Sequence, residues 1–235
     1  MIVNIDKFSP HTHKLRPFDH QLSAFEQTKK LPYYALFWEM VTGKTKPLLD
    51  TMVWLFLQGE IDGVVIVSDK GAYLNWPIEE IPRHVQDDVL DNARIAIWSS
   101  SMNRAQQSKA NEVILAKDDT LDIVCMNVEA FSSAKAVTYV STFIQNHYTL
   151  MIVDESTSIK SPKAKRTKAL IYLGQMVDYR RIATGTPVTQ GPLDLFAQVH
   201  FLKSGLLGHS SFTSFKSYYA IVQTIRMGSR TFPKI

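Results

Sequence analysis

The sequence predicts an α/β protein with a mostly parallel central sheet and helices on both faces. Short apolar runs alternate with longer segments whose apolar residues recur at helical spacing. This alternation is typical of βαβ units, whose right-handed crossovers place helices on both faces of a sheet. A Gly-Lys-Thr turn between the first strand and its helix, and a later strand that ends in two acids, support the same architecture.

The elements are predicted in chain order from their apolar patterns. The expected strands are buried apolar runs at 33–37, 63–68, 94–98, 121–126, 148–154 and 180–184. The expected helices lie at 15–27, 46–57, 72–81, 103–116, 134–146, 163–173 and 193–202. We expect three parts: a leading segment at 1–14, one α/β lobe at 15–203, and a C-terminal appendage at 204–235.

Composition excludes several classes of protein. The 235 residues are 45% hydrophobic and 20% charged, which is ordinary for a globular chain, and the net charge of +4 permits a nucleic-acid partner without requiring one. The single Cys125 fits a reducing compartment, and no run of 18 apolar residues occurs. We therefore expect a cytoplasmic protein without a membrane partner. His11 and His13 have the spacing of a metal pair, but we expect both to be solvated.

The segment 38–45, Trp-Glu-Met-Val-Thr-Gly-Lys-Thr, lies between the first strand and its helix. This context suits a phosphate-binding loop, because backbone N–H groups and the helix dipole at a helix start favour an anion. Lys44 would reach the outer phosphates, and the Thr45 hydroxyl would bind Mg²⁺. Trp38 stands where the usual pattern begins with Gly, so a Gly-Lys-Thr helix start without a ligand remains an alternative.

Two further segments carry polar groups at strand ends. Asp154 and Glu155 follow an apolar strand, which places both carboxylates at the edge of the sheet where α/β proteins bind ligands. Asp154 is placed to hold Mg²⁺, and Glu155 to orient or deprotonate an attacking water. A helix-capping pair is the alternative. The segment 182–195 is a strand followed by a Gly-Pro turn, whose hydroxyls could join the acids to a terminal phosphate.

These three segments, in this order and spacing, resemble the first RecA-like lobe of superfamily 2 helicases, and in particular the Swi/Snf-like DNA translocases. The resemblance implies a P-loop NTPase lobe that hydrolyses ATP with Mg²⁺ while moving on DNA. It implies that Lys44, Asp154 and Glu155 are catalytic and that Thr45 and Asp154 hold the metal. The implied ATP-binding residues are Gln21, Met40, Val41, Thr42, Gly43, Lys44 and Thr45. The residues implied to couple ATP to movement are Thr184, Gly185 and Thr186.

Other segments fit the same family. Residues 15–21 resemble the adenine-reading Q motif, with Gln21 as the adenine contact, and residues 65–76 and 126–129 stand where motifs Ia and Ib are expected. Trp76 could stack on a base, but packing is its expected role. The resemblance implies DNA, as a duplex held by its backbone, with contacts from Ser68, Lys70, Asn127 and Lys160. A run of cations could contribute or form a solvated face: Lys160, Lys163, Lys165, Arg166 and Lys168.

The chain departs from the family pattern at three places. Val41 stands where relatives carry Gly, and a β-branched residue enters positive φ only at a cost, so either φ stays negative or nucleotide binding weakens. Ser156 and Thr157 replace a more usual Ala/Ser-His. No second alternation of strands and helices follows residue 205, whereas such motors take arginines from a second lobe. We therefore expect a fragment, an isolated lobe or half of a split gene, with that lobe as a partner in cis or in trans.

Three functions remain after these observations. The first is the ATP-binding lobe of a DNA-dependent ATPase. The second is a catalytically incomplete module that binds nucleic acid or protein, with a degenerate P-loop. The third, a P-loop kinase or GTPase, is opposed by the Thr-Gly-Thr-Pro segment and by the absence of a guanine-specifying Asn-Lys-x-Asp.

Overall fold

A six-stranded sheet forms the centre of the computed structural model, which describes residues 13–115, 118–221, 223–227 and 230–234. Every neighbouring pair in this sheet is parallel, so the predicted architecture is confirmed. In spatial order the strands are β1 (Tyr33–Phe37), β6 (Tyr179–Thr184), β5 (Thr149–Asp154), β2 (Gly63–Ser68), β4 (Leu121–Asn127) and β3 (Ala93–Ile97).

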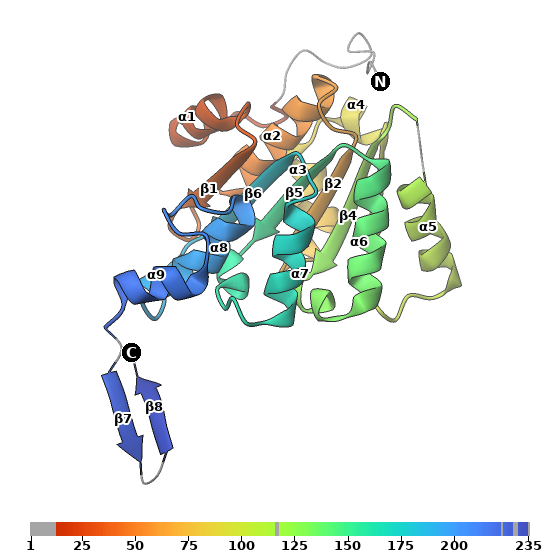
Figure 1. The fold of residues 1–235 in the computed structure, drawn as a ribbon. Helices are drawn as coiled ribbons and strands as arrows, with labels where there is room; N and C mark the ends of the chain where they lie inside the picture. Colours follow the sequence, from red (N-terminus) through yellow and green to blue (C-terminus); the bar gives the residue numbers. More distant parts are fainter. Residues whose placement is uncertain (1–12, 116–117, 222, 228–229, 235) are drawn as a thin grey trace.

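Helices cover both faces of the sheet (Figure 1). The helices that contribute to the core on one face are α5 (Arg104–Leu115), α6 (Ala134–Asn146), α7 (Lys165–Gly174) and α8 (Leu195–Leu202). The other face is covered by α2 (Thr45–Leu57), α3 (Ile81–His84) and α4 (Asp87–Leu90). Two helices lie at the border of the lobe, α1 (Asp19–Thr28) and α9 (Phe212–Tyr219). The short turns are η2 (Trp76–Glu80), η3 (Val128–Ser132), η4 (Ser156–Ile159) and η5 (Pro192–Asp194).

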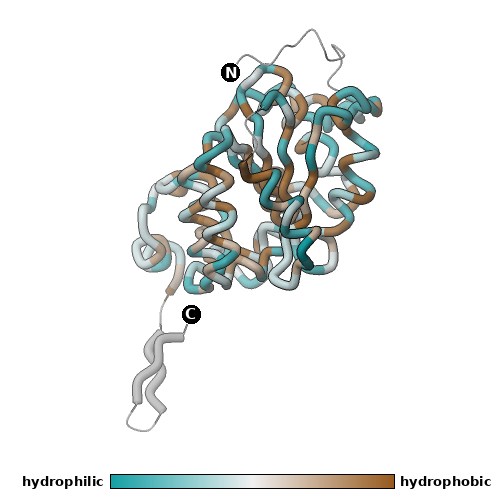
Figure 2. The backbone as a smooth tube through the Cα atoms, turned by 90° about the vertical axis from the view of Figure 1, so that its right-hand side faces the viewer, coloured by the Kyte–Doolittle hydropathy of each residue, from teal (hydrophilic) through white to brown (hydrophobic). Residues whose placement is uncertain are grey.

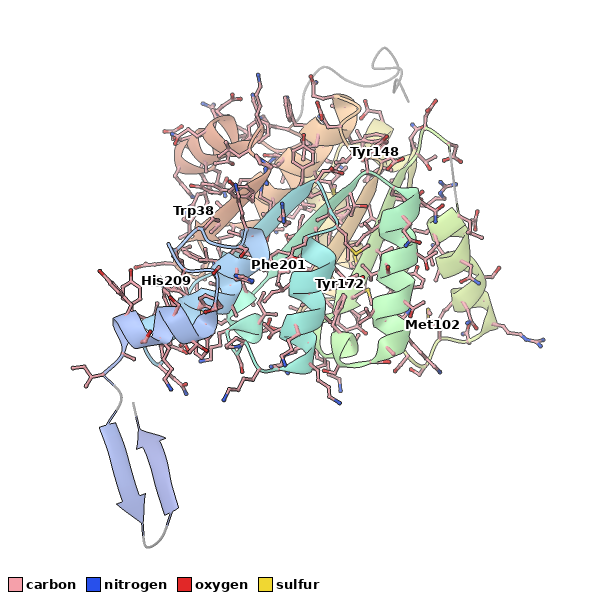
Figure 3. The ribbon with its side chains drawn as sticks, in the orientation of Figure 1. Trp38, Met102, Tyr148, Tyr172, Phe201 and His209 are labelled. Atoms are coloured by element: carbon pink, nitrogen blue, oxygen red, sulfur yellow. The ribbon has the colours of Figure 1, made fainter. Side chains whose placement is uncertain are left out.

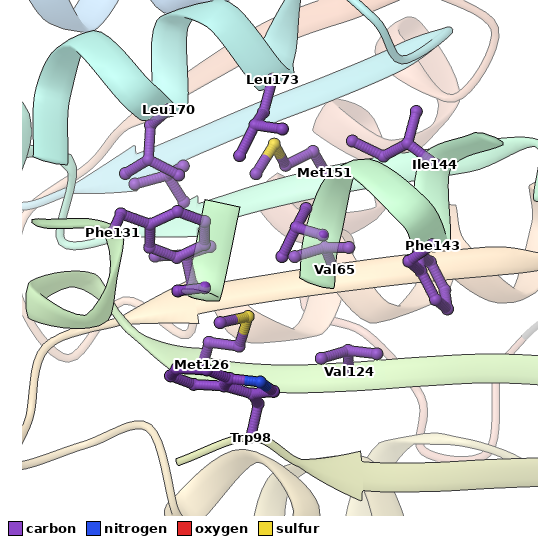
Figure 4. Close-up of a cluster of buried hydrophobic side chains, with 14 of the residues drawn as sticks. Val65, Trp98, Val124, Met126, Phe131, Phe143, Ile144, Met151, Leu170 and Leu173 are labelled. Atoms are coloured by element: carbon purple, nitrogen blue, oxygen red, sulfur yellow. The ribbon is translucent and has the colours of Figure 1, made fainter. Parts of the chain in front are cut away.

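Two apolar clusters, one on each face, hold these layers together. In the first, Phe143 and Leu170 from the helices pack on Val65 and Met151 of the strands (Figure 4). The second cluster joins the apolar side of α2 to the opposite side of the same strands. The strands β2, β4 and β5 are buried on both faces, so their sequences are nearly continuous apolar runs. Figure 2 shows these strands as brown tube at the centre of the lobe.

The predicted helix at 72–81 was wrong in extent. A single π-helical turn, η2, covers residues 76–80, and the four-residue α3 follows it directly. Residues 71–74 form turns, and the helical stretch begins only at Asn75, just before Pro77, whose missing N–H costs least near a helix start. Trp76, at the start of η2, is buried, which confirms the packing role expected for it.

The strand order brings the three predicted segments to one edge. The strands β1, β6 and β5 are neighbours, and their carboxyl ends are in register, with Phe37 opposite Thr184 and Asp154 opposite Ala183. The loop after β1 and the acids after β5 therefore lie on either side of the segment after β6. This edge is where ligands bind in parallel α/β sheets.

Beyond α8, the described residues form α9 and an antiparallel hairpin of β7 (Gln223–Met227) and β8 (Arg230–Lys234). Within the described part of the chain after residue 205, these are the regular elements. No helix among the described residues is long and apolar enough to cross a membrane.

Candidate nucleotide site

The loop between β1 and α2 turns tightly around Gly43. Its φ is +75°, and a Cβ there would lie 2.3 Å from Nε2 of Gln21. The Gln21 amide donates to the carbonyls of Gly43 at 3.1 Å and Thr42 at 3.4 Å. The positive φ favours glycine at position 43, and a residue with a Cβ would also have to displace the Gln21 amide. The loop is therefore fixed from outside by a side chain of α1.

Val41 adopts a left-handed backbone conformation in the same loop. Its φ is +64°, and its side chain is fully exposed, at 102%. Of the two sequence-based alternatives for Val41, the structure therefore excludes the one in which φ stays negative. A β-branched residue in this region is strained by on the order of 1–3 kcal/mol. The loop keeps this conformation without any side-chain packing from Val41 to offset the strain.

Lys44 and Thr45 begin α2 at the end of the loop. The Lys44 ammonium donates back across the loop to the carbonyls of Glu39, at 3.1 Å, and Trp38, at 3.3 Å. Figure 3 shows Trp38 near the end of β1, beside α1. Thr45 is the first residue of α2, where backbone N–H groups have no partner within the helix. The predicted context of strand, Gly-Lys-Thr turn and helix is thus present.

Gln21 is bonded at both ends of its amide. Besides its donation to the loop, its Oε1 accepts from the N–H of Phe18 at 2.9 Å, and Gln21 is buried. His20 adds a contact from Nε2 to the Thr42 carbonyl at 3.0 Å. The side chain predicted to contact adenine thus links the start of α1 to the phosphate loop. The adenine contact itself stays a prediction.

A cavity of about 530 Å³ opens beside Gln21. Its lining combines residues of the predicted segments 15–21 and 38–45 with four residues that sequence reasoning missed, Lys46, Glu80, Arg83 and His84. The buried Lys46 pairs with the buried Asp50, and Asp50 also contacts Nδ1 of His13 at 2.8 Å. The expectation that His13 is solvated was therefore wrong. His11 lies outside the described residues. No group of three or more metal-binding side chains occurs within the described part of the chain.

Asp154 is the last residue of β5 and is partly buried. Ser68 donates to its Oδ2 at 3.3 Å, the N–H of Glu155 donates to Oδ1 at 3.0 Å, and the side chain of Trp76 donates as well. Burial, followed by the charge of Glu155, raises the pKa of Asp154 to about 6 despite these donors. A nearby cation would stabilise the ionised form.

Glu155 begins the acid loop, which we define as residues 155–160. Its backbone is left-handed, with φ +48° and ψ +59°, and Oε2 accepts from Oγ1 of Thr184 at 2.9 Å. Gly185, which directly follows Thr184, is close to the phosphate loop, since a Cβ there would lie 3.2 Å from the backbone N of Met40. The segment after β6 thus touches both the acid and the phosphate loop. The structure brings the three predicted segments together.

The residues predicted to contact DNA separate into two groups. Ser68 is fully buried with its hydroxyl on Asp154, so the predicted DNA contact of Ser68 was wrong. The Lys160 ammonium donates to the hydroxyl of Thr189 and to Oδ2 of Asp194, which lies 3.4 Å away. Although burial opposes ionisation, donors from Gln190 and Thr189, together with Lys160, lower the pKa of Asp194 to about 2. Lys160 is therefore better described as a link within the protein.

Lys70 and Asn127 line one polar groove, as a shared role would require. Its volume is about 560 Å³, and its lining also includes serines after β3 and in η3, the aromatic side chains of Tyr73 and Trp98, and the acidic Glu129. Asn127 also caps η3, because its Oδ1 accepts from the N–H of Ala130 at 2.9 Å. The groove lies at the carboxyl ends of β2 and β4.

Only part of the basic run at 160–168 is exposed and without a hydrogen bond to the protein among the described residues. Arg166 donates from Nε to the carbonyl of Ser158 at 3.0 Å. The lysines that are exposed at the start of α7 are Lys163, Lys165 and Lys168. The helix that follows Lys163, α7, packs against η3, which borders the polar groove.

The chain is similar to known proteins over most of its length. A family model for the SNF2-related domain matches residues 28–227. The Arabidopsis thaliana protein CHROMATIN REMODELING 24 is 25% identical over 184 residues, which cover 77% of this chain and 16% of that protein. The chromatin-remodeling ATPase INO80 of Pyricularia oryzae is 29% identical over 182 residues, covering 76% of this chain and 9% of that protein. The chain thus spans a small part of the length of these relatives.

A solved structure supports the fold. The Sulfolobus solfataricus SWI2/SNF2 ATPase core in complex with dsDNA matches with a TM-score of 0.67 and 21% sequence identity. The match covers 91% of this chain and 41% of that chain. At this identity the likeness establishes the arrangement of sheet and helices, and the chemistry has to be argued from the side chains.

Proposed function

Because the chain belongs to the SNF2-related domain family, we propose that residues 15–203 form the ATP-binding lobe of a DNA-dependent ATPase that translocates on DNA. One observation carries the proposal: the phosphate loop, the acid pair and the segment after β6 meet at one edge of the sheet, joined by the contacts of Thr184 and Gly185. Phosphate release from Mg-ATP, measured with and without duplex DNA, tests it directly.

The donor set fits a magnesium ion. Thr45 offers a hydroxyl at the start of α2, and Asp154 offers a carboxylate whose raised pKa reflects burial beside a second negative charge. Oxygen ligands of this kind, few in number and shared with phosphates, are what Mg²⁺ takes in nucleotide sites. When bound, the ion would neutralise charge on the β and γ phosphates.

The residues of the chain have separate tasks in the proposed hydrolysis. Lys44 leaves the loop carbonyls and binds the outer phosphates, while the N–H groups at the start of α2 hold the inner ones. Glu155 orients the attacking water and accepts its proton. Thr184, which donates to Oε2 of Glu155, fixes the direction of that carboxylate and leaves Oε1 for the water. Stabilisation of the transition state is mainly electrostatic.

The Val41→Gly variant should bind Mg-ATP more tightly than the wild type. Strain at φ +64° favours other loop shapes, and glycine removes that penalty from the shape described here. Relief of about 1.4 kcal/mol would strengthen binding about tenfold. Isothermal titration calorimetry measures the change, and Val41→Ala, which keeps a Cβ without branching, should fall between the two. Equal affinity of all three proteins would show that the strain does not oppose binding.

Duplex DNA is the proposed partner, held by its phosphates in the groove of Lys70 and Asn127. Support comes from the lysine, asparagine and serine side chains in the lining of that groove, from the exposed lysines at the start of α7, and from the family to which the chain belongs. Lysines and small polar groups suit phosphates rather than base edges. Binding should therefore be indifferent to sequence.

Neutralising Lys163 and Lys165 together, each to Gln, should flatten the salt dependence of DNA binding. Removing one lysine–phosphate interaction changes the slope of log K against log salt by about 0.9 for duplex DNA. Fluorescence anisotropy at several salt concentrations gives the slope. Lys30, after α1, and Lys109, on α5, are equally exposed, so Lys30→Gln/Lys109→Gln is a control of matched charge. The same slope for both double variants would place the DNA elsewhere.

The binding-module alternative makes a different prediction, namely ATP or DNA affinity without phosphate release. Val41 is its support, while the Glu155–Thr184 contact favours turnover.

The second RecA-like lobe, in cis or in trans, belongs to the proposal as the partner that completes the site. The cytoplasmic location stays a prediction.

A further inference from the structure

A fully buried glutamine on α8 links the acid loop to the turn after β6. Oε1 of Gln198 accepts from Oγ of Ser156 at 2.7 Å, and Ser156 is also fully buried. Nε2 of Gln198 donates to the carbonyls of Pro187 and Asp194, both at 2.8 Å. Both ends of the amide are therefore used, and one side chain connects three segments of the chain.

Ser156 directly follows the strained residue of the acid loop. A left-handed conformation at a non-glycine residue persists only when its surroundings hold it there. The N–H and carboxylate of Glu155 are bonded to Asp154 and Thr184, and its carbonyl accepts from the N–H of Ser158 at 2.9 Å. The hydroxyl of Ser156 ties the residue directly after Glu155 to α8, while Arg166 of α7 holds the carbonyl of Ser158 further along the acid loop.

Packing alone does not account for a glutamine at this position. Its neighbours along α8, Phe196, Ala197, Phe201 and Leu202, are buried and apolar. An aliphatic residue of similar length would fill the same space without a polar group to satisfy. The amide instead has a bonding role, because burying it without partners would be unfavourable.

We propose that Gln198 is a positioning residue for Glu155 and acts through Ser156. Its amide holds the turn of the acid loop at a fixed distance from the segment after β6, so that the Glu155 carboxylate stays directed by Thr184. This inference rests on the proposed hydrolysis, in which Glu155 orients the water. A small displacement of such a group can lower turnover about 10²-fold while leaving nucleotide binding intact.

Ser156→Ala is the sharpest variant, because it removes the link and keeps Gln198 with both of its carbonyl partners. Ser158→Ala is the matched control: Ser158 lies in the same turn, and its buried hydroxyl has no partner among the described residues. Under single-turnover conditions with excess protein, Ser156→Ala should release phosphate 10- to 100-fold more slowly, with a half-saturating ATP concentration within about threefold of the wild type. Ser158→Ala should match the wild type.

A second measurement does not depend on catalysis. Hydrogen exchange of the amides at positions 158 and 160, which donate within the acid loop to Glu155 and Thr157, should be at least tenfold faster in Ser156→Ala than in the wild type. Gln198→Leu should reproduce the effect, and the Ser156→Ala/Gln198→Leu double variant should add little to either single change if both act through one link.

The outcomes separate the inference from the function on which it rests. Wild-type exchange and turnover in Ser156→Ala would overturn the role of Gln198 and leave hydrolysis standing. An equal loss of ATP affinity in that variant would also overturn it, since the link would then support binding as a whole. If the wild type releases no phosphate, the proposed hydrolysis fails, and the exchange rates alone decide whether the link positions the acid loop.

Discussion

Lys44→Ala is expected to weaken Mg-ATP binding by roughly 10- to 10²-fold. A charge-assisted hydrogen bond contributes roughly 1.5–3 kcal/mol, and 1.4 kcal/mol is a factor of ten in affinity. In the structure the ammonium lies over the phosphate loop, 3.1 Å from the Glu39 carbonyl, and can turn toward an anion without any movement of α2. Titration calorimetry with ATP and Mg²⁺ gives the affinity.

The fold should survive this substitution. Among the described residues, the Lys44 ammonium donates to the carbonyls of Trp38 and Glu39, and Lys44 belongs to neither apolar cluster, so its removal opens no cavity there. The unfolding temperature of the variant should therefore lie close to that of the wild type. Lys30→Ala removes an exposed lysine after α1 and serves as the control for net charge. Unchanged ATP affinity in Lys44→Ala would exclude the loop as the nucleotide site.

Much of the site was predictable from the sequence because of the way parallel sheets are built. A strand buried on both faces reads as an apolar run, and the polar residue that ends it must lie at the carboxyl edge. Asp154 at the end of β5 and Thr184 at the end of β6 follow this rule. To predict that the phosphate loop and the acids lie close together, one also has to know the order of the strands in the sheet. The periodicity of the sequence does not contain that order.

The errors arose where a side chain had two environments to choose from. Ser68 ends a strand as Asp154 does, but its small hydroxyl turns inward to that carboxylate. Lys160 lies in a basic run, but its ammonium pairs with Asp194 and so is not available to a DNA phosphate as the exposed lysines of the run are. Gln198 was missed because it lies in a strongly apolar helix, where one polar residue gives no periodic signal. Each outcome depended on a partner far away in the sequence.

Two arginines near the start of β6 can be excluded as substitutes for an arginine from a second lobe. Arg181 is buried, and its Nη2 donates to the carbonyls of Thr28 and Leu31, which precede β1. Arg180 is opposite Tyr33, the first residue of β1. The phosphate loop follows the other end of that strand, roughly 13 Å further along at 3.3 Å per residue. Both guanidinium groups therefore belong to the opposite edge of the sheet.

The 235-residue chain should accordingly bind ATP but hydrolyse it slowly, with little stimulation by DNA. An arginine that stabilises charge on the γ-phosphate contributes about 10³–10⁵ in rate among NTPases. Supplying the second lobe, either in a longer polypeptide or as a separate chain, should restore much of this factor. Steady-state phosphate release with saturating duplex DNA measures the gain.

Restoration should require an intact Glu155, because the base and the arginines act on the same transition state from opposite sides. Glu155→Gln keeps the shape of the side chain and an oxygen for the Thr184 hydroxyl, so it should still bind Mg-ATP and still take up the second lobe. It should nevertheless gain almost no turnover. Strong DNA-stimulated hydrolysis by the purified chain as a monomer would contradict this division of labour, since the charge stabilisation would then have to come from a group within residues 1–235.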